Sequence, residues 1–561
     1  MLNADIKKIL LRLAIVAFFV AVLVLGLCAY KDYGISTDEP IQRRHGLVNY
    51  RYVNETVFGR DMSKMDNIWV ISDNSSLPNL EKYQNKYYGV AIQMPLVFIE
   101  DLADFTMTTQ QIYFMRHLYN FLIFFIALIC FFFLCKDLLK SESWAFVGTV
   151  MLLLCPRFFA ESFYNIKDLM FVSLLIIALF FMVKMLLNKR KTLWCVFFAI
   201  TCAFATNSRV IGIMLAAAVI MVMFLEDIVG HFTNNKEIKF LLPKNEEKSM
   251  GLRICGFLRP YIIFCLAYVF FYILISPASW RDPFEFIKNT LVSFADYQPW
   301  QGKMLFGGQL ITKEQLPWYY ILGWMGMTIP IFHLLMFFIG TCSLICNTIK
   351  GKFIKFVEIR YVWVVFLLFL IPLLGFIIFN LKIYLGWRHV YFLAPPLLLV
   401  AVFGAKSLHE KLQMHIKKVR KYIVPGLMGA VFACIAVWMI IAHPYQNVYF
   451  NAVGRTVATK FDRDYWRLAS ADMLRYLLNT YTDSINVCSS MDIAMMKNIL
   501  SPEQQARINV VDTCEEADFV LDNFRYTVGN DYEVKGYSED YSIYVDGFKI
   551  GTVLKNKEYT E

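Results

Sequence analysis

Two adjacent carboxylates, Asp38 and Glu39, stand in the run Gly34-Ile35-Ser36-Thr37-Asp38-Glu39-Pro40. An apolar stretch over about 9–30 comes directly before this run. About 20 apolar residues at 1.5 Å per residue span the roughly 30 Å core of a bilayer, so the pair is expected just past a membrane boundary. There the two residues and Pro40 can serve as a helix start, with Asp38 as the cap. They can also do chemistry, which the rest of the chain favours.

Isolated cations are expected at the same boundary. Lys167 and Asp168 stand where a helix is predicted to begin, Arg209 lies in a short loop, and Arg388 precedes His389 in another loop. Each cation alone can snorkel or anchor a helix at the interface. Several cations around one cavity would clamp a lipid phosphate, because arginine pairs with phosphate in a bidentate way.

Aromatic residues accompany these cations. Tyr88, Tyr164 and Trp387 each stand within a few residues of a glycine or a charged side chain in an outer loop. Aromatic faces stack on sugars, although tyrosine and tryptophan are also common at membrane interfaces. A further loop over 277–317 combines aromatic residues with glycines and is predicted to form a mobile flap above a cavity.

The composition is that of a membrane protein. Hydrophobic residues make up 58% of the chain, and the mean hydropathy is +0.49, whereas soluble domains are about 45–50% apolar. The sequence predicts an α-helical polytopic protein with about eleven transmembrane helices. The predicted spans are 9–30, 112–135, 143–156, 168–187, 192–206, 210–226, 259–276, 318–347, 360–380, 389–405 and 423–442.

Basic residues set the predicted orientation. They cluster before the first span and in alternate loops, which the positive-inside rule places in the cytoplasm. The clustered loops are 136–140, 189–191, 350–355 and 406–421. The outer loops are then 30–111, 157–167, 277–317 and 381–388, and 443–561 also lies outside. These clusters explain most of the net charge of +10, so nucleic acid is not an expected partner. The chain is expected in the inner or plasma membrane, with a cytoplasmic N-terminus that is an anchor and not a cleaved signal.

Two parts lie outside the spans. The first outer loop, 30–111, is predicted to carry two juxtamembrane helices, over 38–54 and 90–105, with a plain surface loop as the alternative. The first of these helices would have Ile41, Leu47 and Val48 on its apolar side. Residues 1–442 form the transmembrane domain.

Residues 443–561 form a small α/β domain. Its predicted helices are 461–479 and 491–500, its strands 484–489, 509–512 and 519–523, and its hairpin 541–545 with 548–554. Cys488 and Cys514 are its only cysteines. They either form a disulfide, which an extracytoplasmic compartment permits, or remain two buried thiols.

Several functions find no support in the sequence. The longest cytoplasmic loop, 227–258, is too short for a nucleotide-binding α/β domain, and no glycine-rich phosphate loop occurs. No histidine or cysteine spacing typical of a metal site is present. No internal repeat suggests an inverted-repeat transporter.

The order of the motifs resembles the GT-C glycosyltransferases, and within them the bacterial relatives of protein O-mannosyltransferases and the lipid A aminoarabinose transferases. The resembling motifs are Thr37-Asp38-Glu39-Pro40, Tyr164-Asn165-Ile166-Lys167-Asp168, the Arg209 loop, Gly386-Trp387-Arg388-His389, His443-Pro444-Tyr445-Gln446 and Asp464-Tyr465-Trp466. The likeness covers the membrane part and is loose over 484–561. It implies transfer of a sugar from a polyprenyl-phosphate donor to a hydroxyl of a glycan, lipid or protein acceptor on the outer face. The transfer would invert the configuration at the anomeric carbon.

The resemblance also implies roles for individual residues. Asp38 would be the general base, with Glu39 beside it as the second catalytic carboxylate. The cations Lys167, Arg209 and Arg388 would bind the donor phosphate. Sugar or acceptor would contact Asp168, Tyr164, His389, Trp387 and Tyr88. No cofactor is expected, and metal dependence is left open.

A transporter or flippase of lipid-linked glycans is the alternative. Such a protein would need charged residues within its spans, near the middle of the membrane. In this sequence the charges gather at the outer ends of the predicted helices, and this distribution favours the enzyme.

Overall fold

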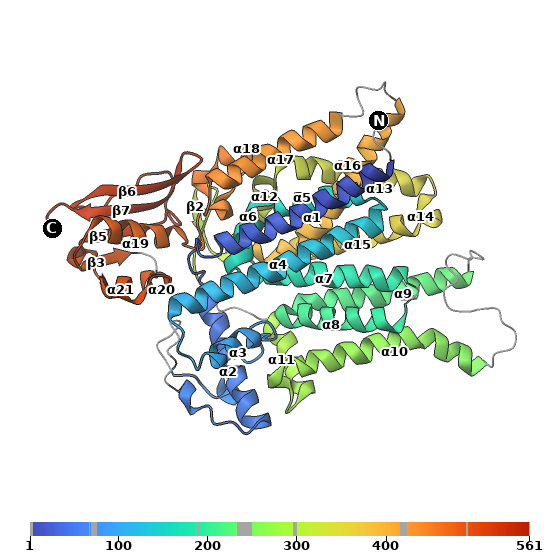
Figure 1. Cartoon of the computed structure of the whole chain (residues 1–561), viewed down its shortest axis with the longest axis horizontal. Helices are drawn as coiled ribbons and strands as arrows, with labels where there is room; N and C mark the ends of the chain where they lie inside the picture. The colour runs from blue at the N-terminus through green and yellow to red at the C-terminus, as the bar shows by residue number, and fades with distance from the viewer. Residues whose placement is uncertain are drawn as a thin grey trace.

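The computed structural model describes residues 4–66, 68, 76–188, 190–232, 250–295, 300–415, 423–489 and 492–559. Long helices run side by side in a bundle, and a small sheet domain sits at one end of it (Figure 1). Within the described residues, eight helices are long and apolar enough to cross a membrane. The predicted class, a polytopic helical membrane protein with a small C-terminal α/β domain, is confirmed.

The predicted spans correspond to helices in nearly every case. The long apolar helices are α1 (Ala4–Ala29), α4 (Thr109–Leu139), α7 (Asp168–Leu187), α9 (Ile213–Phe232, preceded by η3, Val210–Gly212), α13 (Ile331–Ile349), α15 (Val357–Ile378), α16 (Ala394–His415, preceded by η6, Arg388–Leu393) and α17 (Ile423–Ile441). The spans predicted at 192–206 and 259–276 are α8 (Thr192–Ser208) and α10 (Met250–Leu274), whose apolar parts are shorter.

Two predicted spans are broken by proline. The span predicted over 143–156 is α5 (Glu142–Leu153), which turns by 67° into α6 (Pro156–Tyr164). The outer loop predicted over 157–167 is therefore largely a buried helix. The span predicted over 318–347 is divided into α12 (Tyr320–Thr328) and α13 at Pro330. Proline has no N–H to donate and starts a new helix more readily than it continues one.

Glycine allows the closest helix packing in the bundle. A Cβ at Gly340 of α13 would lie 2.0 Å from the carbonyl oxygen of Val400, and one at Gly404 of α16 would lie 2.2 Å from that of Met336. The two backbones therefore touch where no side chain fits between them, as is common in transmembrane helix pairs.

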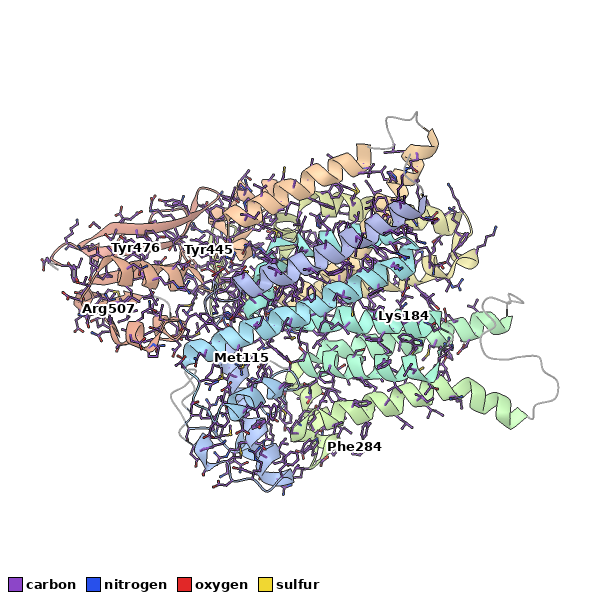
Figure 2. The ribbon with its side chains drawn as sticks, viewed as in Figure 1. Met115, Lys184, Phe284, Tyr445, Tyr476 and Arg507 are labelled. Atoms are coloured by element: carbon purple, nitrogen blue, oxygen red, sulfur yellow. A yellow bond between two sulfur atoms is a disulfide. The ribbon has the colours of Figure 1, made fainter. Side chains whose placement is uncertain are left out.

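The two ends of the bundle differ. α1 begins near α14 (Lys352–Lys355) at one end, and the basic loops predicted to be cytoplasmic adjoin that end (Figure 1). At the other end lie α2 (Glu39–Val57), α3 (Met94–Leu102) and the C-terminal domain. Tyr476 and Arg507 mark that domain, and Lys184 lies toward the basic end (Figure 2). Residues 233–249, within the loop predicted over 227–258, lie outside the described residues, as do 189 and 416–422 of the basic loops.

The first outer loop contains both predicted helices, α2 and α3, with short turns η1 (Ser63–Met65) and η2 (Leu80–Lys82) between them. The apolar side predicted for α2 holds for Leu47 and Val48, which are buried, and is wrong for Ile41, which is 40% exposed. α2 is instead packed on most of its sides. Its buried Arg43 donates to Glu100 of α3 at 2.7 Å, so an ion pair joins the two helices.

The loop over 277–317, predicted to form a mobile flap, contains regular elements in its described residues, 277–295 and 300–317. It contains η4 (Pro277–Ser279), α11 (Pro283–Ala295), the hairpin of β1 (Met304–Phe306) and β2 (Gln309–Ile311), and η5 (Lys313–Gln315). The Leu305 N–H donates to Asp462 Oδ1 at 2.8 Å, and the Gly308 N–H donates to the Lys460 carbonyl at 2.8 Å. These bonds fix the hairpin to the start of the C-terminal domain.

The C-terminal domain is a five-stranded mixed sheet in the order β4-β3-β5-β7-β6. β3 is parallel to β4 and β5, while β7 is antiparallel to β5 and β6. The strands are β3 (Ile485–Ser489), β4 (Ile508–Val510), β5 (Phe519–Asp522), β6 (Tyr537–Val545) and β7 (Phe548–Asn556). The helical segments are η8 (Gln446–Val448), α18 (Ala452–Arg455), η9 (Ala458–Lys460), α19 (Ala469–Thr480), α20 (Ile493–Lys497), α21 (Pro502–Ala506) and η10 (Cys514–Glu516).

Two predictions for this domain have definite outcomes. Cys488 and Cys514 form a disulfide, with their Cα atoms 5.1 Å apart. The helix predicted over 461–479 begins only at Ala469 and is wrong before that residue, because Asp462 and Asp464 accept backbone N–H groups that hold the chain in a turn. The predicted helix over 491–500 is shorter, and residue 491 lies outside the described residues.

Candidate functional site

Asp38 lies where the chain leaves α1 and enters α2. It occupies the N-cap position of α2, yet its side chain makes no capping hydrogen bond. Asp38 Oδ2 instead accepts a hydrogen bond from Arg388 Nη1 at 2.7 Å. A carboxylate that was only a helix cap would bond to the first turn of its own helix, so capping does not explain this side chain.

Glu39 is fully buried and braces the turn that carries Asp38. Glu39 Oε2 accepts from the Ser36 N–H at 2.7 Å, and Oε1 lies 3.1 Å from His117 Nε2 on α4. The other ring nitrogen of His117 lies 3.1 Å from the Tyr30 carbonyl oxygen. The structure therefore places Glu39 between the turn and α4, with both of its oxygens engaged.

Arg388 connects three parts of the molecule. Its Nη1 reaches Asp38 at 2.7 Å and Asp168 Oδ2 at 3.0 Å. Its guanidinium lies 4.7 Å from the ring centre of Trp466 and 5.4 Å from that of Tyr384. Arg388 is buried at the start of η6, Asp168 begins α7, and Trp466 belongs to the C-terminal domain. The domain therefore closes over the same guanidinium that holds the two carboxylates.

Lys167 and Arg209 complete the cation set. Arg209 pairs with Asp168, and Lys167 Nζ lies 4.9 Å from the ring centre of Tyr88. Tyr88 in turn stacks on His45 of α2 with ring centres 5.0 Å apart. The predicted convergence of Lys167, Arg209 and Arg388 with Asp38 is therefore what the structure shows.

A glycine brings the first outer loop against the Arg209 loop. A Cβ at Gly89 would lie 1.5 Å from the Asn207 carbonyl oxygen. The Ala91 N–H also donates to Asn207 Oδ1 at 3.0 Å. Only glycine permits this approach, which holds Tyr88 beside the loop that carries Arg209.

The charges of the site determine the protonation of Asp38 and Lys167. Burial raises the pKa of Asp38, but the positive charges of Arg388 and Lys167 outweigh burial and lower this pKa to about 2. Burial lowers the pKa of Lys167 to about 8, although Asp38 opposes this effect. At neutral pH the carboxylate is therefore ionised and the lysine largely protonated.

Three of the predicted sugar or acceptor residues have other surroundings. The Tyr164 carbonyl oxygen accepts from Ser36 Oγ at 2.9 Å, and its ring meets Trp466 edge-on with centres 6.0 Å apart. His389 packs against Tyr384 with ring centres 4.4 Å apart. Trp387 donates from Nε1 to Thr328 at 2.9 Å and packs toward α12. Tyr164 and His389 therefore border the site, and Trp387 faces away from it.

A buried network that sequence reasoning missed fixes the Lys167–Asp168 turn. Glu161 accepts hydrogen bonds from Tyr391 at 2.8 Å, from Tyr465 at 2.9 Å and from Asn165 at 2.6 Å. Asn165 Oδ1 then accepts from the Asp168 N–H at 2.7 Å. Tyr465 comes from the C-terminal domain, so this network ties that domain to the start of α7. Glu161 and Tyr465 are about 300 positions apart, so no local pattern in the sequence predicts their contact.

The part of the chain that the structure describes contains no cluster of metal-ligating side chains. No three histidine, cysteine, aspartate or glutamate side chains there are placed to hold one ion. Asp38 and Asp168 share Arg388 as a partner.

Two carboxylates therefore face buried cations at one end of the helical bundle. Residues 52–278 match the sequence model of the dolichyl-phosphate-mannose-protein mannosyltransferase family. The match confirms the resemblance over that stretch and supports a membrane glycosyltransferase. It includes Lys167, Asp168 and Arg209 and leaves out Asp38 and Arg388.

Solved structures of glycosyltransferases are similar to the chain at low identity. ArnT from Cupriavidus metallidurans in the apo state is 13% identical with a TM-score of 0.45, and each chain is covered to 98%. The same protein bound to undecaprenyl phosphate is 11% identical with a TM-score of 0.45, again with 98% of each chain covered. An Archaeoglobus fulgidus oligosaccharyltransferase is 12% identical with a TM-score of 0.41, over 89% of this chain and 63% of that one. No curated protein matches the sequence.

Proposed function

We propose that this chain transfers a sugar from a polyprenyl-phosphate donor to an acceptor hydroxyl on the outer face of the membrane. The observation that carries the proposal is the contact of Asp38 with Arg388, at 2.7 Å, inside a set of cations that includes Lys167 and Arg209. A base and a phosphate-binding set are the two things that the reaction needs on the protein.

Exposure distinguishes the two carboxylates. The Asp38 side chain is 16% exposed, whereas that of Asp168 is fully buried. Asp168 also has both oxygens engaged, by Arg209 and Arg388. Asp38 is therefore the carboxylate that an acceptor hydroxyl can reach, and Asp168 is the residue that orients the two arginines.

The reaction then proceeds in one displacement. Asp38 takes the proton of the acceptor hydroxyl as its oxygen attacks the anomeric carbon. The bond from that carbon to the phosphate oxygen breaks, and the electron pair leaves with the polyprenyl phosphate. Lys167, Arg209 and Arg388 stabilise the charge that develops on this phosphate. With one base and no carboxylate nucleophile, the anomeric configuration is inverted.

Donor binding also explains the ion pair between Asp38 and Arg388. A donor phosphate competes with Asp38 for the Arg388 guanidinium, and this competition frees the carboxylate for the acceptor. The family description supports a donor of this class, since it names a sugar carried on a polyprenyl phosphate. The sugar and the acceptor of this chain are not specified by these residues.

The orientation proposed for the chain follows its basic loops. The site lies at the end of the bundle opposite the clustered lysines, which the positive-inside rule assigns to the cytoplasm. The site is then extracytoplasmic, as is the C-terminal domain. The alternative, a flippase, is disfavoured because the site charges lie at helix ends: Lys167 precedes α7, Arg209 follows α8 and Arg388 begins η6.

A reconstituted assay tests the proposal. The full chain is reconstituted in liposomes with a synthetic polyprenyl-phosphate sugar. The acceptor is identified beforehand, by mass spectrometry of surface glycans from cells with and without the chain. The proposal is supported if the parent chain releases polyprenyl phosphate, if Asp38→Asn abolishes this release, and if Asp66→Asn, a control in an exposed loop, retains it. Movement of intact lipid-linked sugar between leaflets without its release would favour the flippase.

A further inference from the structure

Two arginines of the C-terminal domain each have an Nε without a hydrogen-bond partner in the described residues. Arg525 is only 5% exposed, and its Nε makes no hydrogen bond within the described residues. Arg467 is half-buried, and its Nε is also without a partner there. Neither guanidinium forms an ion pair with the described part of the chain. The Arg525 guanidinium lies 5.0 Å from the ring centre of Tyr526. A buried cation without an ion-pair partner costs folding free energy, so its retention calls for an explanation.

Both arginines lie beside the site already described. Arg467 directly follows Trp466, whose ring lies 4.7 Å from the Arg388 guanidinium. The loop of Arg525 is tied to the same turn, because Asn523 Nδ2 donates to the Asp464 carbonyl at 2.8 Å. Burial lowers the pKa of Arg525 and the Asp462 carboxylate opposes this effect, while the charges of Arg467 and Arg388 act in the same direction as burial. The three cations are therefore near enough to repel one another.

The backbone is unusual at Arg467 and directly before Arg525. Arg467 has a φ of +66°, and Phe524, next to Arg525, has a φ of +55°. Side chains other than glycine rarely adopt this left-handed region, and such residues gather where function requires a particular orientation. The fold thus maintains two uncommon backbone conformations, one at Arg467 and one directly before Arg525.

The charge balance of this place is positive. Five cations face four carboxylates, which leaves one positive charge in excess when every carboxylate is ionised. The groups are Lys167, Arg209, Arg388, Arg467 and Arg525 against Asp38, Asp168, Asp462 and Asp464. Burial raises the pKa of Asp462 to about 7 and that of Asp464 to about 6, so the excess is larger near neutral pH. One phosphodiester carries a single negative charge and does not neutralise the excess there.

We propose that Arg467 and Arg525 form a second phosphate-binding position beside the donor-phosphate position. This inference rests on the proposed function, which assigns the first position to Lys167, Arg209 and Arg388. Guanidinium groups pair with phosphate oxygens in a bidentate way, which suits two forks from adjacent loops. The second phosphate comes either from a donor that carries a diphosphate or from an acceptor that carries a phosphate group.

Binding of three soluble probes tests the second position. The full chain in lipid nanodiscs is titrated with farnesyl phosphate, farnesyl diphosphate and inorganic phosphate. Arg525→Gln and Arg467→Gln are compared with Arg475→Gln, a control in the same domain whose arginine already pairs with Asp472 at 2.7 Å. We expect Arg525→Gln to weaken binding of a phosphate probe by about tenfold or more, and Arg475→Gln to bind every probe as the parent does.

The source of the second phosphate decides which probe responds. If the parent prefers farnesyl diphosphate to farnesyl phosphate and Arg525→Gln removes this preference, the second phosphate belongs to the donor. In the other case the two farnesyl probes bind alike, while inorganic phosphate still binds the chain saturated with farnesyl phosphate. If Arg525→Gln then abolishes this binding of inorganic phosphate, the second phosphate belongs to the acceptor. Both results support the position.

Unchanged binding of all three probes by Arg525→Gln and Arg467→Gln would overturn the inference. Where Arg525→Gln fails to fold, as judged by thermal unfolding, the half-buried Arg467→Gln and the charge-preserving Arg525→Lys take its place. The transfer assay on the parent chain separates this inference from the proposed function. A parent chain that shows no transferase activity but still binds phosphate through Arg525 would remove the proposed function and keep the second position.

Discussion

Two buried arginines at opposite ends of α7 have very different surroundings. Arg190, just past the end of α7, donates to both oxygens of Asp227 at 2.8 and 2.9 Å, to Glu226 at 3.1 Å and to the Met223 carbonyl at 3.1 Å. Arg388, which begins η6 and reaches Asp168 at the start of α7, also holds two carboxylates, but it shares them with Lys167 and Arg209.

The difference lies in which charge is in excess. The two carboxylates around Arg190 more than neutralise it, and they also accept hydrogen bonds from Tyr261 and Tyr361. Around Arg388 the cations outnumber the carboxylates. A cluster whose charges are met inside the protein holds helices together, whereas a buried cation excess is a site prepared for an anion. Five expectations test this contrast.

Asp38→Asn has the largest expected effect. Asparagine keeps the shape and a hydrogen bond to Arg388 but cannot take a proton, so transfer should fall by about 10²–10⁴-fold, the usual share of a general base. Expression and thermal unfolding should stay near those of the parent. Release of polyprenyl phosphate by the purified chain measures the effect, and a parental rate would show that Asp38 is not the base.

Glu39→Gln provides the matched comparison. Glu39 touches Ser36 and His117 and no cation of the site. Its amide should lower transfer by less than Asp38→Asn does and should change the thermal stability more, because it weakens the brace between the turn and α4. An equal loss of transfer from both variants would instead assign Glu39 a direct role.

Arg388→Lys and Arg190→Lys test the contrast between the two ends directly. A lysine is a point charge and cannot bridge two carboxylates as a planar fork does. Arg388→Lys should therefore lower transfer by about 10²-fold, comparable to the loss of one donor to developing charge. Arg190→Lys should lower the melting temperature and leave kcat of the folded fraction unchanged. A loss of kcat at Arg190 would mean that its cluster has more than a structural role.

Sequence predictions succeeded where neighbouring residues determine the structure. Spans, the strands of the C-terminal domain and the convergence of Asp38 with Lys167, Arg209 and Arg388 were predictable, because apolar runs and alternation are local and helix ends at one membrane face must meet. The break of the span at Pro330 was readable from one residue. The position of Trp387 against α12 was not predictable, since adjacent residues of a turn point in opposite directions.

Contacts between the two domains could not be predicted. Trp466 against Arg388, Tyr465 against Glu161 and Asp462 against Leu305 each join segments more than 75 residues apart. They depend on how the C-terminal domain docks, and nothing local encodes docking. The helix predicted from Phe461 failed for the same reason: its polar residues bond to distant backbone in preference to forming a turn of helix.

Lys167 should give the site an alkaline limit. Its pKa is about 8 in the folded chain, and a lysine in the unfolded chain titrates near 10.5. As pH rises through about 8 the clamp loses a charge, and transfer at pH 9 should be about one-tenth of its maximum if the charge is required. The unfolded chain binds more protons between the two values, so this lysine's contribution to stability rises with pH in that window, and unfolding does not cause the loss. Lys167→Arg should remove the decline; a decline that persists in this variant would assign it to another group.

The smallest effect on transfer is expected from the disulfide, which lies at β3, away from both arginine clusters. Replacing both cysteines with serine in a Cys488→Ser/Cys514→Ser chain should leave kcat unchanged. It should destabilise the C-terminal domain by about 3 kcal/mol, the chain-entropy value for a loop of this length, and lower its melting temperature. Thiol counting on the denatured, unreduced proteins provides the check. The parent and the double variant should give the same number of thiols, because the bridged pair contributes none; two more thiols in the parent would show that the bridge does not form.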